Sequence, residues 1–564
     1  MFIKITTSGP RRYVQLVEAY RDVKGRPKQR TVATLGRLDQ LDSELESVIS
    51  GLLRVTGKSL PEPAPIPLVS FESARSYGDV WALTELWNDL GFHDLRKIFR
   101  RTRHAIDVEA LIRVMVLNRL CDPDSKLGVL RWLETVSLPG ILIESIQHHH
   151  LLRAMDAIVE HKDEVEQVVS NLLRSLVDQD LAVVFYDMTT IRAQGLSEQA
   201  GDVRGFGMAK EGLIARQFML GVVQTAEGLP LYHEVFDGNT VEVTTLKPVI
   251  EKIVHRFPVK RVIALADHGL LSTDNLTQLQ AIELPAGGML EFILAVPGRR
   301  YADFADLLAP FHAAQCVQAQ QEVLGEAKWG QLRLIIAHDP HGAREAGAKR
   351  DAILESLEQK AAQWTIKLDA QDAGTRKRGR KLSDGGARAR FYHEVCEAHL
   401  ARIVKVDLKS ELFTYTIDEH ALSHARMMDG KLLLVTNTAD LVPDDVMKRY
   451  KSLADIERGF RVLKSEIEIG PVYHRLPDRI HAHAAICFMA LILYRVMRTR
   501  LHASQTSLSP ERALSNLGRI QHHRVTLNGA QCITGVSTIN AEQTSILAAL
   551  TIKKPTIDTQ LTLL

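Results

Sequence analysis

The chain has 564 residues, of which 45% are hydrophobic and 24% are charged, a composition typical of a soluble protein with two to four domains. Its formal net charge of only +2 excludes a strong positive field over the whole surface, so nucleic acid would have to be bound by local basic patches. Five scattered cysteines without a CxxC pair predict neither a disulfide framework nor a zinc ribbon.

No signal peptide or membrane span is predicted. The N-terminus lacks an apolar core, and the most apolar run, residues 484–494, is too short to cross a bilayer and predicts a buried helix. We therefore expect a cytoplasmic protein with no membrane partner.

The first predicted element is small and basic, and it covers residues 1–57. Residues 1–37 hold nine Lys or Arg against two acidic residues, and FIKITT and RYVQLVEAYR alternate as strands do. Gly25 and Pro27 mark a turn after them. A basic β-element of this kind suits the DNA backbone. Its predicted DNA contacts are Arg11, Arg12, Arg26, Lys28 and Arg30. Residues 58–71 include four prolines and are predicted to be a linker.

Residues 72–178 are predicted to form a helical domain. Apolar residues recur at steps of three and four in VWALTELWNDLGF, DVEALIRVMVLNRL and KLGVLRWLETV. Residues 95–131 hold nine Lys or Arg against four acids, so the domain is a candidate for DNA binding, with a plain helical scaffold as the alternative. Three histidines at 148–150 are adjacent, point to different faces and predict a surface rather than a metal site.

The period changes from helical to extended at residue 181. Strands are predicted over LAVVFYDMTTIR, ARQFMLGVVQT and LPLYHEVF, followed by helix, strand, helix and strand up to residue 297. This order predicts a mixed sheet with helices on its faces, the RNase H-like arrangement, over residues 179–297. In that arrangement the first strand is central and pairs with the later parallel strand, so Asp187 and Asp267 would lie side by side.

An insertion of mixed α/β structure is predicted over residues 298–428, because Asp267 and Glu457 are 190 positions apart, too far for a simple core. Within it we expect a hairpin over 317–339, a helix over 343–363 and a strand over 413–422. The basic run at 376–381 lacks the lysine and the preceding strand of a phosphate-binding loop. It predicts a DNA-contacting loop, with a solvated charge run as the alternative. Its candidate contacts are Arg376, Lys377 and Arg378.

The second part of the core is predicted over residues 429–504. The stretch 448–468 has helical spacing, and Tyr450, Glu457 and Lys464, seven residues apart, would share one face of a single helix. A surface helix with solvated charges is the alternative. The remaining residues, 505–564, predict a polar tail with one or two short helices.

Three carboxylates, Asp187, Asp267 and Glu457, would then converge. Like charges repel unless cations lie between them, and oxygen ligands suit Mg²⁺ or Mn²⁺. Two such ions about 4 Å apart activate a water or hydroxyl and stabilise the leaving 3′ oxygen in phosphodiester cleavage. The pattern therefore predicts metal-dependent cleavage of a nucleic acid.

The motifs together resemble those of the DDE transposases of bacterial insertion sequences, and in particular the group named for a Tyr-Arg-Glu-Lys signature. The resemblance lies in YDMTT (186–190), FDGNTVE (236–242), ADHG (266–269), LLLVTNT (432–438), IGPVYHR (469–475) and the helix between them. Tyr450, Glu457 and Lys464 match the signature spacing. Leu453 replaces its arginine, a departure for which Arg449 or Arg458 could partly substitute.

The resemblance implies a DNA transposase that binds element ends and performs cut-and-paste transposition. It implies that Asp187, Asp267 and Glu457 bind two Mg²⁺ (or Mn²⁺) ions. It also implies that Tyr450 and Lys464 contact DNA, and Arg458 and Arg461 in the same stretch are further candidate contacts. The implied partners are double-stranded DNA at the element ends and the target, and a second copy of the chain, with no small-molecule cofactor. The alternatives are an RNase H-like nuclease such as a junction resolvase, and an inactive DNA-binding remnant.

Overall fold

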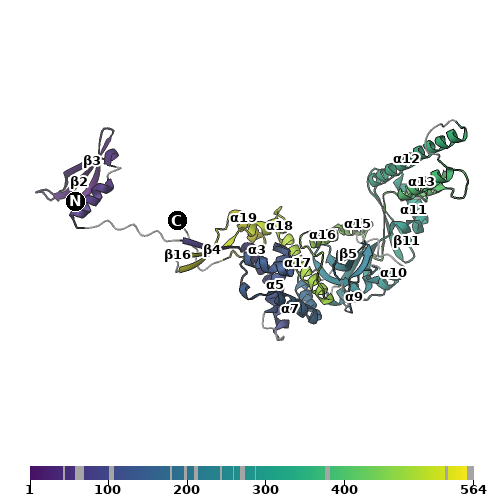
Figure 1. Cartoon of the computed structure of the whole chain (residues 1–564). Helices are drawn as coiled ribbons and strands as arrows, with labels where there is room; N and C mark the ends of the chain where they lie inside the picture. The colour runs from purple at the N-terminus through teal and green to yellow at the C-terminus, as the bar shows by residue number, and fades with distance from the viewer. Residues whose placement is uncertain are drawn as a thin grey trace. The chain divides into compact units, whose positions relative to one another are not determined.

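The structure is a computed structural model that describes residues 1–41, 45–57, 69–100, 107–177, 181–195, 200–208, 214–241, 244–257, 260–266, 273–285, 287–374, 382–527 and 531–555. The chain divides into two compact units (Figure 1). One contains Met1–Ser70 and Thr526–Cys532, and the other contains Phe71–Val525 and Ile533–Leu564.

The N-terminal unit is built on the predicted basic β-element. Strands β1 (Phe2–Ser8), β2 (Arg11–Arg21) and β3 (Pro27–Arg37) form an antiparallel sheet in that order. Gly25, with a φ of 75°, makes the turn that the sequence predicts. Helix α1 (Leu38–Leu41) packs on β2 and β3, and α2 (Leu45–Val55) follows. The proline-rich stretch 58–68 lies outside the described residues.

Helices form the first part of the larger unit, as the apolar periodicity predicts. They are α3 (Gly78–Leu90), η1 (Phe92–Asp94), α4 (Leu95–Phe99), α5 (Val108–Cys121), α6 (Lys126–Thr135), η2 (Ile143–Ser145), α7 (His148–Glu160) and α8 (Lys162–Arg174). Asp107 and Ser125 cap α5 and α6 by accepting hydrogen bonds from Ala110 and Gly128.

Helix α17 (Pro477–Ala503) runs through the centre of this unit. It packs against α3, α5, α7, α16, α18 and α19 and against strand β8, and it is buried without interruption from Ile486 to Met497. Among the described residues it is the one helix long and apolar enough to cross a membrane by length and composition, but 89% of its apolar window is buried inside the protein. A helix that is apolar on all sides and covered by protein is a core helix, which confirms the predicted buried helix.

A mixed nine-stranded sheet forms the second half of the unit. Its order is β11-β12-β15-β10-β9-β5-β7-β6, and β8 also pairs with β7. Central strand β5 is antiparallel to β7 and parallel to β9, and β9 is parallel to β10. The predicted mixed sheet and the predicted neighbours of its first strand are therefore confirmed. The strands are β5 (Leu181–Arg192), β6 (Gly205–Met208), β7 (Ile214–Thr225), β8 (Pro230–Phe236), β9 (Arg261–Ala266), β10 (Glu291–Ala295), β11 (Val323–Trp329), β12 (Leu332–His338) and β15 (Lys431–Thr436).

Different helices cover the two faces of this sheet. Helix α9 (Leu246–Arg256) lies on the face of Tyr186, whose hydroxyl is 2.5 Å from that of Thr245 at the start of the helix. The opposite face carries Asp187, because side chains alternate along a strand. Helices α16 (Ala454–Ser465) and α17 cover that opposite face. Helix α10 (Thr273–Gln280) packs on β10.

The predicted insertion is wrong in one respect. Its hairpin, β11 and β12, extends the main sheet by pairing β12 with β15. Only residues 340–428 have a separate apolar core, which includes Leu357, Phe391 and Leu422. The predicted strand at 413–422 is also shorter, since Asp418 caps a helix there. The elements between β10 and β15, apart from the hairpin, are η4 (Gly298–Phe304), α11 (Ala305–Phe311), η5 (His312–Cys316), α12 (Pro340–Asp372), α13 (Asp384–Glu397), β13 (Val404–Val406), β14 (Tyr415–Ile417) and α14 (Glu419–Met428).

The C-terminal residues form short helices, as predicted, but they pack into the main core instead of forming a polar tail. Leu517, Ile520 and Ile546 are buried in the main apolar core, and the indole of Trp81 donates a hydrogen bond of 3.0 Å to the carbonyl of Lys553. The elements are α18 (Pro510–Leu517), β16 (Gln521–Leu527), β17 (Gln531–Val536) and α19 (Ala541–Ala549), with β4 (Val69–Ser76) joining β16 and β17 in a small sheet.

The close packing of α16 on the sheet can be tested at Gly459. A Cβ atom there would lie 3.0 Å from the amide oxygen of Gln224 on β7 and 3.1 Å from a guanidinium nitrogen of Arg495 on α17, and closer still to the Gln224 amide nitrogen. We expect Gly459→Ala to destabilise the protein by about 1–3 kcal/mol through overpacking, measured as a lower melting temperature.

Gly347→Ala is the matched control. Gly347 is also helical, on α12, and the nearest atoms to an added Cβ are 3.8 Å away. The better helix propensity of alanine should leave the melting temperature unchanged or raise it. Equal melting temperatures for the two variants would contradict the packing of α16 on β7.

Candidate active site and DNA-contacting surfaces

Asp187 is the half-buried carboxylate of an otherwise largely buried strand. The residues of β5 on either side of it, Tyr186 and Met188, are buried. Its Oδ1 atom accepts a hydrogen bond of 2.7 Å from the backbone N–H of Met188. Asp187 therefore lies near the middle of the central strand with a half-exposed carboxylate, and not at the end of the strand.

The strand that leads to Asp267 lies next to β5, as predicted. Tyr186 pairs with Ala266, the last residue of β9 and the residue before Asp267 in the sequence. Asp267 itself lies outside the described residues, and so does the side chain of Glu457. The convergence of the three carboxylates therefore stays a prediction.

The helix of Glu457 covers the face of the sheet that carries Asp187. Gln224 pairs with Phe185, and Val222 pairs with Asp187, so the side chains of Gln224 and Asp187 belong to the same face. Gly459 on α16 abuts Gln224 on this face, and α16 also contacts β5. The backbone therefore brings the predicted catalytic helix to the predicted catalytic strand.

The predicted single helix from 448 to 468 is wrong. The chain forms two helices, α15 (Pro443–Lys451) and α16, separated by Ser452 and Leu453. The Ser452 hydroxyl donates to the carbonyl of Arg449 at 2.6 Å, and the N–H of Leu453 bonds to the carbonyl of Tyr450, three residues back. A serine hydroxyl that takes a backbone carbonyl competes with the helical ladder. Tyr450 and Glu457 therefore belong to different helices.

The predicted DNA contacts of this region differ in exposure. Tyr450 is only 9% exposed, on a helix that packs against β11 and β12. Lys464 is half-buried, whereas Arg458 and Arg461 are exposed on α16. The two arginines are thus the more accessible of these cations for a phosphate backbone.

Two buried polar residues near Asp187 were not singled out from the sequence. Gln224 is fully buried, and neither of its amide atoms has a hydrogen-bond partner among the described residues. Arg495 is buried on α17, close to Gly459 and Gly228. The signal that could have found them is a lone polar residue in an apolar run, LGVVQT for Gln224 and ALILYRVM for Arg495.

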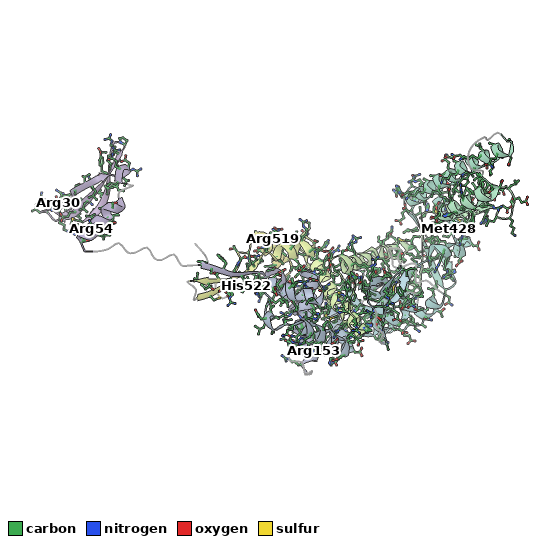
Figure 2. The ribbon with its side chains drawn as sticks, viewed as in Figure 1. Arg30, Arg54, Arg153, Met428, Arg519 and His522 are labelled. Atoms are coloured by element: carbon green, nitrogen blue, oxygen red, sulfur yellow. The ribbon has the colours of Figure 1, made fainter. Side chains whose placement is uncertain are left out.

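The basic residues of the N-terminal sheet fall into two groups. Arg30 pairs with Glu18 at 2.7 Å, and Lys28 pairs with Asp22 at 3.5 Å. The side chains of Arg11, Arg12 and Arg26 are exposed and make no ion pair within the described part of the chain. Figure 2 labels Arg30 on this unit. Arg376, Lys377 and Arg378 of the insertion lie outside the described residues.

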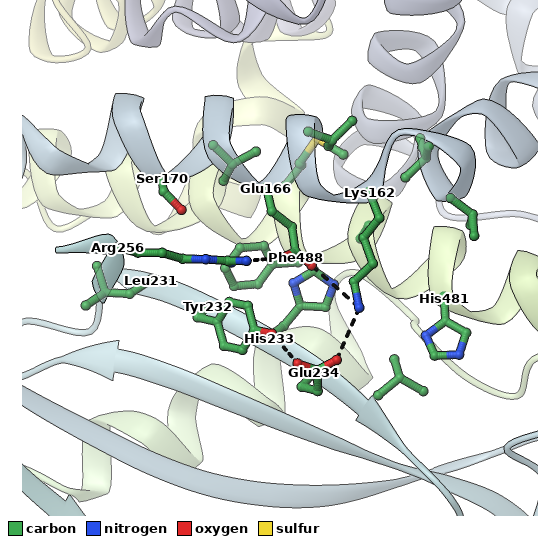
Figure 3. A pocket seen from close by; sticks show the side chains of 17 residues that line it. Lys162, Glu166, Ser170, Leu231, Tyr232, His233, Glu234, Arg256, His481 and Phe488 are labelled. Carbon is green, nitrogen blue, oxygen red and sulfur yellow. Dashed lines mark hydrogen bonds and ion pairs between the residues drawn. The ribbon is translucent and has the colours of Figure 1, made fainter. Parts of the chain in front are cut away.

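A charged cluster under α8 is structural, because its groups are paired (Figure 3). A cavity of about 50 Å³ is lined by α8, β8 and α17. Lys162 lies 3.2 Å from Glu234, and Arg256 pairs with Glu166. Burial opposes ionisation of Glu234, but hydrogen bonds from Lys252 and Tyr232 outweigh it and lower its pKa to about 2.

His233 lies in the same cavity and is neutral. Burial lowers its pKa to about 3, and its ring stacks on Phe488 at 4.5 Å. The ring therefore packs between the sheet and α17 rather than serving as a proton donor. Within the described residues, which do not include Asp267 or the Glu457 side chain, no group of three or more His, Cys, Asp or Glu side chains could hold a metal ion.

Residues 3–64 match a family described as the IS1634 family transposase, N-terminal domain. The chain is similar to insertion-sequence transposases. This match confirms the resemblance indicated by the sequence motifs, and it falls on the basic sheet and α2 rather than on the predicted catalytic residues. No curated protein matches the sequence.

Two solved structures are similar over most of the chain. One is a piggyBac transposase synaptic complex with hairpin DNA, 7% identical over 78% of this chain and 79% of that chain, with a TM-score of 0.37. The other is the Drosophila P element transposase strand transfer complex, 11% identical over 74% of this chain and 86% of that chain, with a TM-score of 0.20. Both TM-scores are below 0.5.

The two groups of N-terminal cations predict different losses of DNA affinity. Each phosphate contact removed lowers the slope of log affinity against log salt by about 0.9. Replacing Arg11, Arg12 and Arg26 by glutamine should flatten the slope most, because none of them forms an ion pair with an acid among the described residues. Replacing Lys28 and Arg30 should flatten it less, since Asp22 and Glu18 already pair with them. The measurement is DNA affinity at several salt concentrations.

The control for this pair of variants is Lys328→Gln, an exposed lysine on β11 in the other unit. It should leave the slope as it is. An unaltered slope in the Arg11, Arg12 and Arg26 variant would exclude the N-terminal sheet as a DNA contact.

Proposed function

We propose that this protein is a DNA transposase that binds insertion-sequence ends and catalyses metal-dependent strand cleavage and strand transfer, in a cut-and-paste reaction. One observation carries the chemistry: the helix of Glu457 lies on the sheet face that holds Asp187, next to the strand that leads to Asp267. The match of residues 3–64 to a transposase domain supports the biological setting.

We identify the strands β8-β7-β5-β9-β10 with an RNase H-like core. Three antiparallel strands are followed by two parallel ones, with β5 at the centre. This order supports that assignment, because it brings residues distant in sequence to one edge of the sheet.

Asp187, Asp267 and Glu457 would hold two Mg²⁺ (or Mn²⁺) ions in this proposal. The half-buried carboxylate of Asp187 fits that role, since carboxylate oxygens are the ligands these cations prefer. When bound, the ions would supply Lewis-acid activation of the attacking oxygen and stabilise the leaving one. The chain itself would hold the carboxylates in place through β5, β9 and α16, and the buried α17 beneath α16 would keep that helix from shifting.

DNA would be held by cations outside this centre. Arg458 and Arg461 are exposed on the same helix as Glu457, and the N-terminal sheet supplies Arg11, Arg12 and Arg26. We propose double-stranded DNA at the element ends and the target as the partner, with two copies of the chain in the active complex, in the cytoplasm.

Glu457→Gln separates catalysis from scaffolding. The substitution keeps the size and helix propensity of the side chain and removes the charge that would balance a cation. Cleavage of DNA carrying the element ends should fall by orders of magnitude, and Asp187→Asn should do the same. The melting temperature without metal should stay the same or rise, since like-charge repulsion among the carboxylates is relieved. Metal-free DNA binding should persist.

Glu397→Gln serves as the control, because Glu397 is exposed at the end of α13 and far in sequence from the predicted site. It should cleave like the wild-type protein. If Glu457→Gln cleaves DNA at the wild-type rate, Glu457 is not an active-site residue. Cleavage lost together with a collapsed melting transition would favour a structural role. Mapping the nicks distinguishes a transposase, which cuts at the element ends, from a junction resolvase, which cuts at branched DNA.

A further inference from the structure

A second and larger cavity lies away from the predicted catalytic carboxylates. Its volume is about 540 Å³. It opens between the helical layer, at α5 and α6, and the segment 468–475 that connects α16 to α17. Basic and imidazole side chains dominate its polar lining. The lining residues used below are Arg119, Lys126, Tyr473, His474, Arg475 and His483.

The wall formed by residues 468–475 is fixed in place. The guanidinium of Arg119 donates to the carbonyls of Ile467 at 3.4 Å and Glu468 at 3.3 Å. Arg204, whose side chain is fully buried, donates to the carbonyls of His474 at 3.2 Å and Arg475 at 3.1 Å. Two buried arginines therefore hold both ends of the segment, and the cavity is formed before any ligand arrives.

Between those two ends, the segment pairs with β5. Val472 forms a bridge with Ala193 just beyond the strand, and it exchanges backbone hydrogen bonds with Arg192 and Gln194. Asp187 lies six residues before Ala193 on this chain segment. At about 3.3 Å per residue, the cavity wall is about 20 Å from Asp187, a distance that a few nucleotides of a DNA strand can span.

Lys126 is the unusual group in this cavity. It is the first residue of α6, is only 6% exposed and lines the cavity. Among the described residues no acceptor or acid lies within hydrogen-bond or ion-pair distance of its ammonium. Burial, with a smaller contribution from the nearby cation of Arg119, lowers its pKa to about 7. A buried amine without an acidic partner is costly to keep protonated, and an anionic ligand in the cavity would favour its charged form.

The other charges around the cavity do not supply that anion. Asp124 is held by the N–H of Ser125 at 2.6 Å and by Arg131 at 3.2 Å. Glu468 is exposed, at the rim. Arg479 is neutralised by both oxygens of Asp156, at 2.7 and 2.9 Å.

His474 and His483 are neutral hydrogen-bonding groups, and one more cation lies at the rim. Burial lowers the pKa of His474 to about 4 and that of His483 well below its usual range. The Nδ1 atom of His483 is buried without a partner among the described residues. Arg475 and His148 are exposed at the rim. The cavity thus combines unneutralised positive charge with neutral donors and acceptors.

We propose that this cavity binds a phosphate ester, with Lys126 as the buried cation and Arg475 as the cation at the entrance. The volume exceeds what a single phosphate fills and has room for a nucleotide. Tyr473, which is 67% exposed, offers an aromatic face on which a base can stack.

Two sources carry the same chemistry, a phosphate within a DNA strand and a free nucleotide. The assignment of DNA as the source rests on the proposed function, whereas the phosphate site itself does not. The wall segment's connection to β5 favours a strand that also reaches Asp187.

Lys126→Met tests the proposal in the full-length protein. Methionine matches the length of the lysine side chain and removes its charge. The probes are inorganic phosphate, thymidine 5′-monophosphate with thymidine as its match, and a short single-stranded oligonucleotide with and without a 5′-phosphate. Binding is measured by calorimetry in phosphate- and sulfate-free buffer. We expect affinity for phosphorylated probes to fall about tenfold or more in the variant, the effect of losing one charge-assisted hydrogen bond.

The melting temperature distinguishes a ligand-binding role of Lys126 from a structural one, because loss of a structural residue would lower it. Without ligand, Lys126→Met should melt no lower than the wild-type protein, because a buried unpaired charge is replaced by an apolar group. Lys328→Met, an exposed lysine on β11, is the matched control and should change neither affinity nor melting.

Three outcomes decide the proposal. Phosphate-dependent binding that is lost in Lys126→Met and kept in Lys328→Met supports it, and tighter binding of the oligonucleotide than of the nucleotide identifies DNA as the source. Equal binding by Lys126→Met and the wild-type protein would overturn it. The proposal would also be overturned if no phosphorylated probe binds the wild-type protein. If that same preparation still cleaves element ends, the proposed function stands and only the phosphate site is excluded.

Discussion

The burial of α17 on all sides is the constraint on which the larger unit depends. An apolar helix of this length is stable only when other elements surround it, and here the helical layer supplies one side while the sheet and α16 supply the other. The two halves therefore share one apolar core instead of packing as separate domains. The stacking of His233 on Phe488 and the paired charges around Glu234 lie along this shared boundary. The position of α16 over Asp187 depends on this burial, because α16 packs against α17.

The sequence predicted those parts of the fold whose signals are local. Alternation predicted the N-terminal strands, and buried β-branched runs ending in acids predicted β5 and β9 as neighbours. It failed where the decisive partner is distant. The hairpin of β11 and β12 joins the sheet only because β15, about a hundred residues later, pairs with it. The C-terminal residues look polar, but Leu517 and Ile546 meet a core built by residues hundreds of positions earlier.

The candidate site shows the same division between local and distant information. Asp187 could be selected because an acid ends an apolar run, and the structure places it on the face that α16 covers. The break at Ser452 was missed because serine tolerates a helix, and its hydroxyl decides the outcome only through one hydrogen bond to Arg449. The unpaired ammonium of Lys126 could not be found from sequence at all. A lysine at the start of an amphipathic helix is usually solvated, whereas this one is buried among α5, α17 and segment 468–475.

The paired ends of the insertion have a consequence for how this chain can change. The chain leaves the sheet at His338 and returns at Lys431, and these two residues are direct partners across β12 and β15. Residues 340–428 have their own apolar core, so the segment is attached through a single narrow neck whose two strands are already hydrogen-bonded to each other. Insertions of this kind are tolerated because neither the sheet nor the inserted body has to reorganise around the junction. Residues 340–428 can therefore be lengthened, replaced or lost in the course of evolution, whereas β5 and α16 remain constrained by the common core.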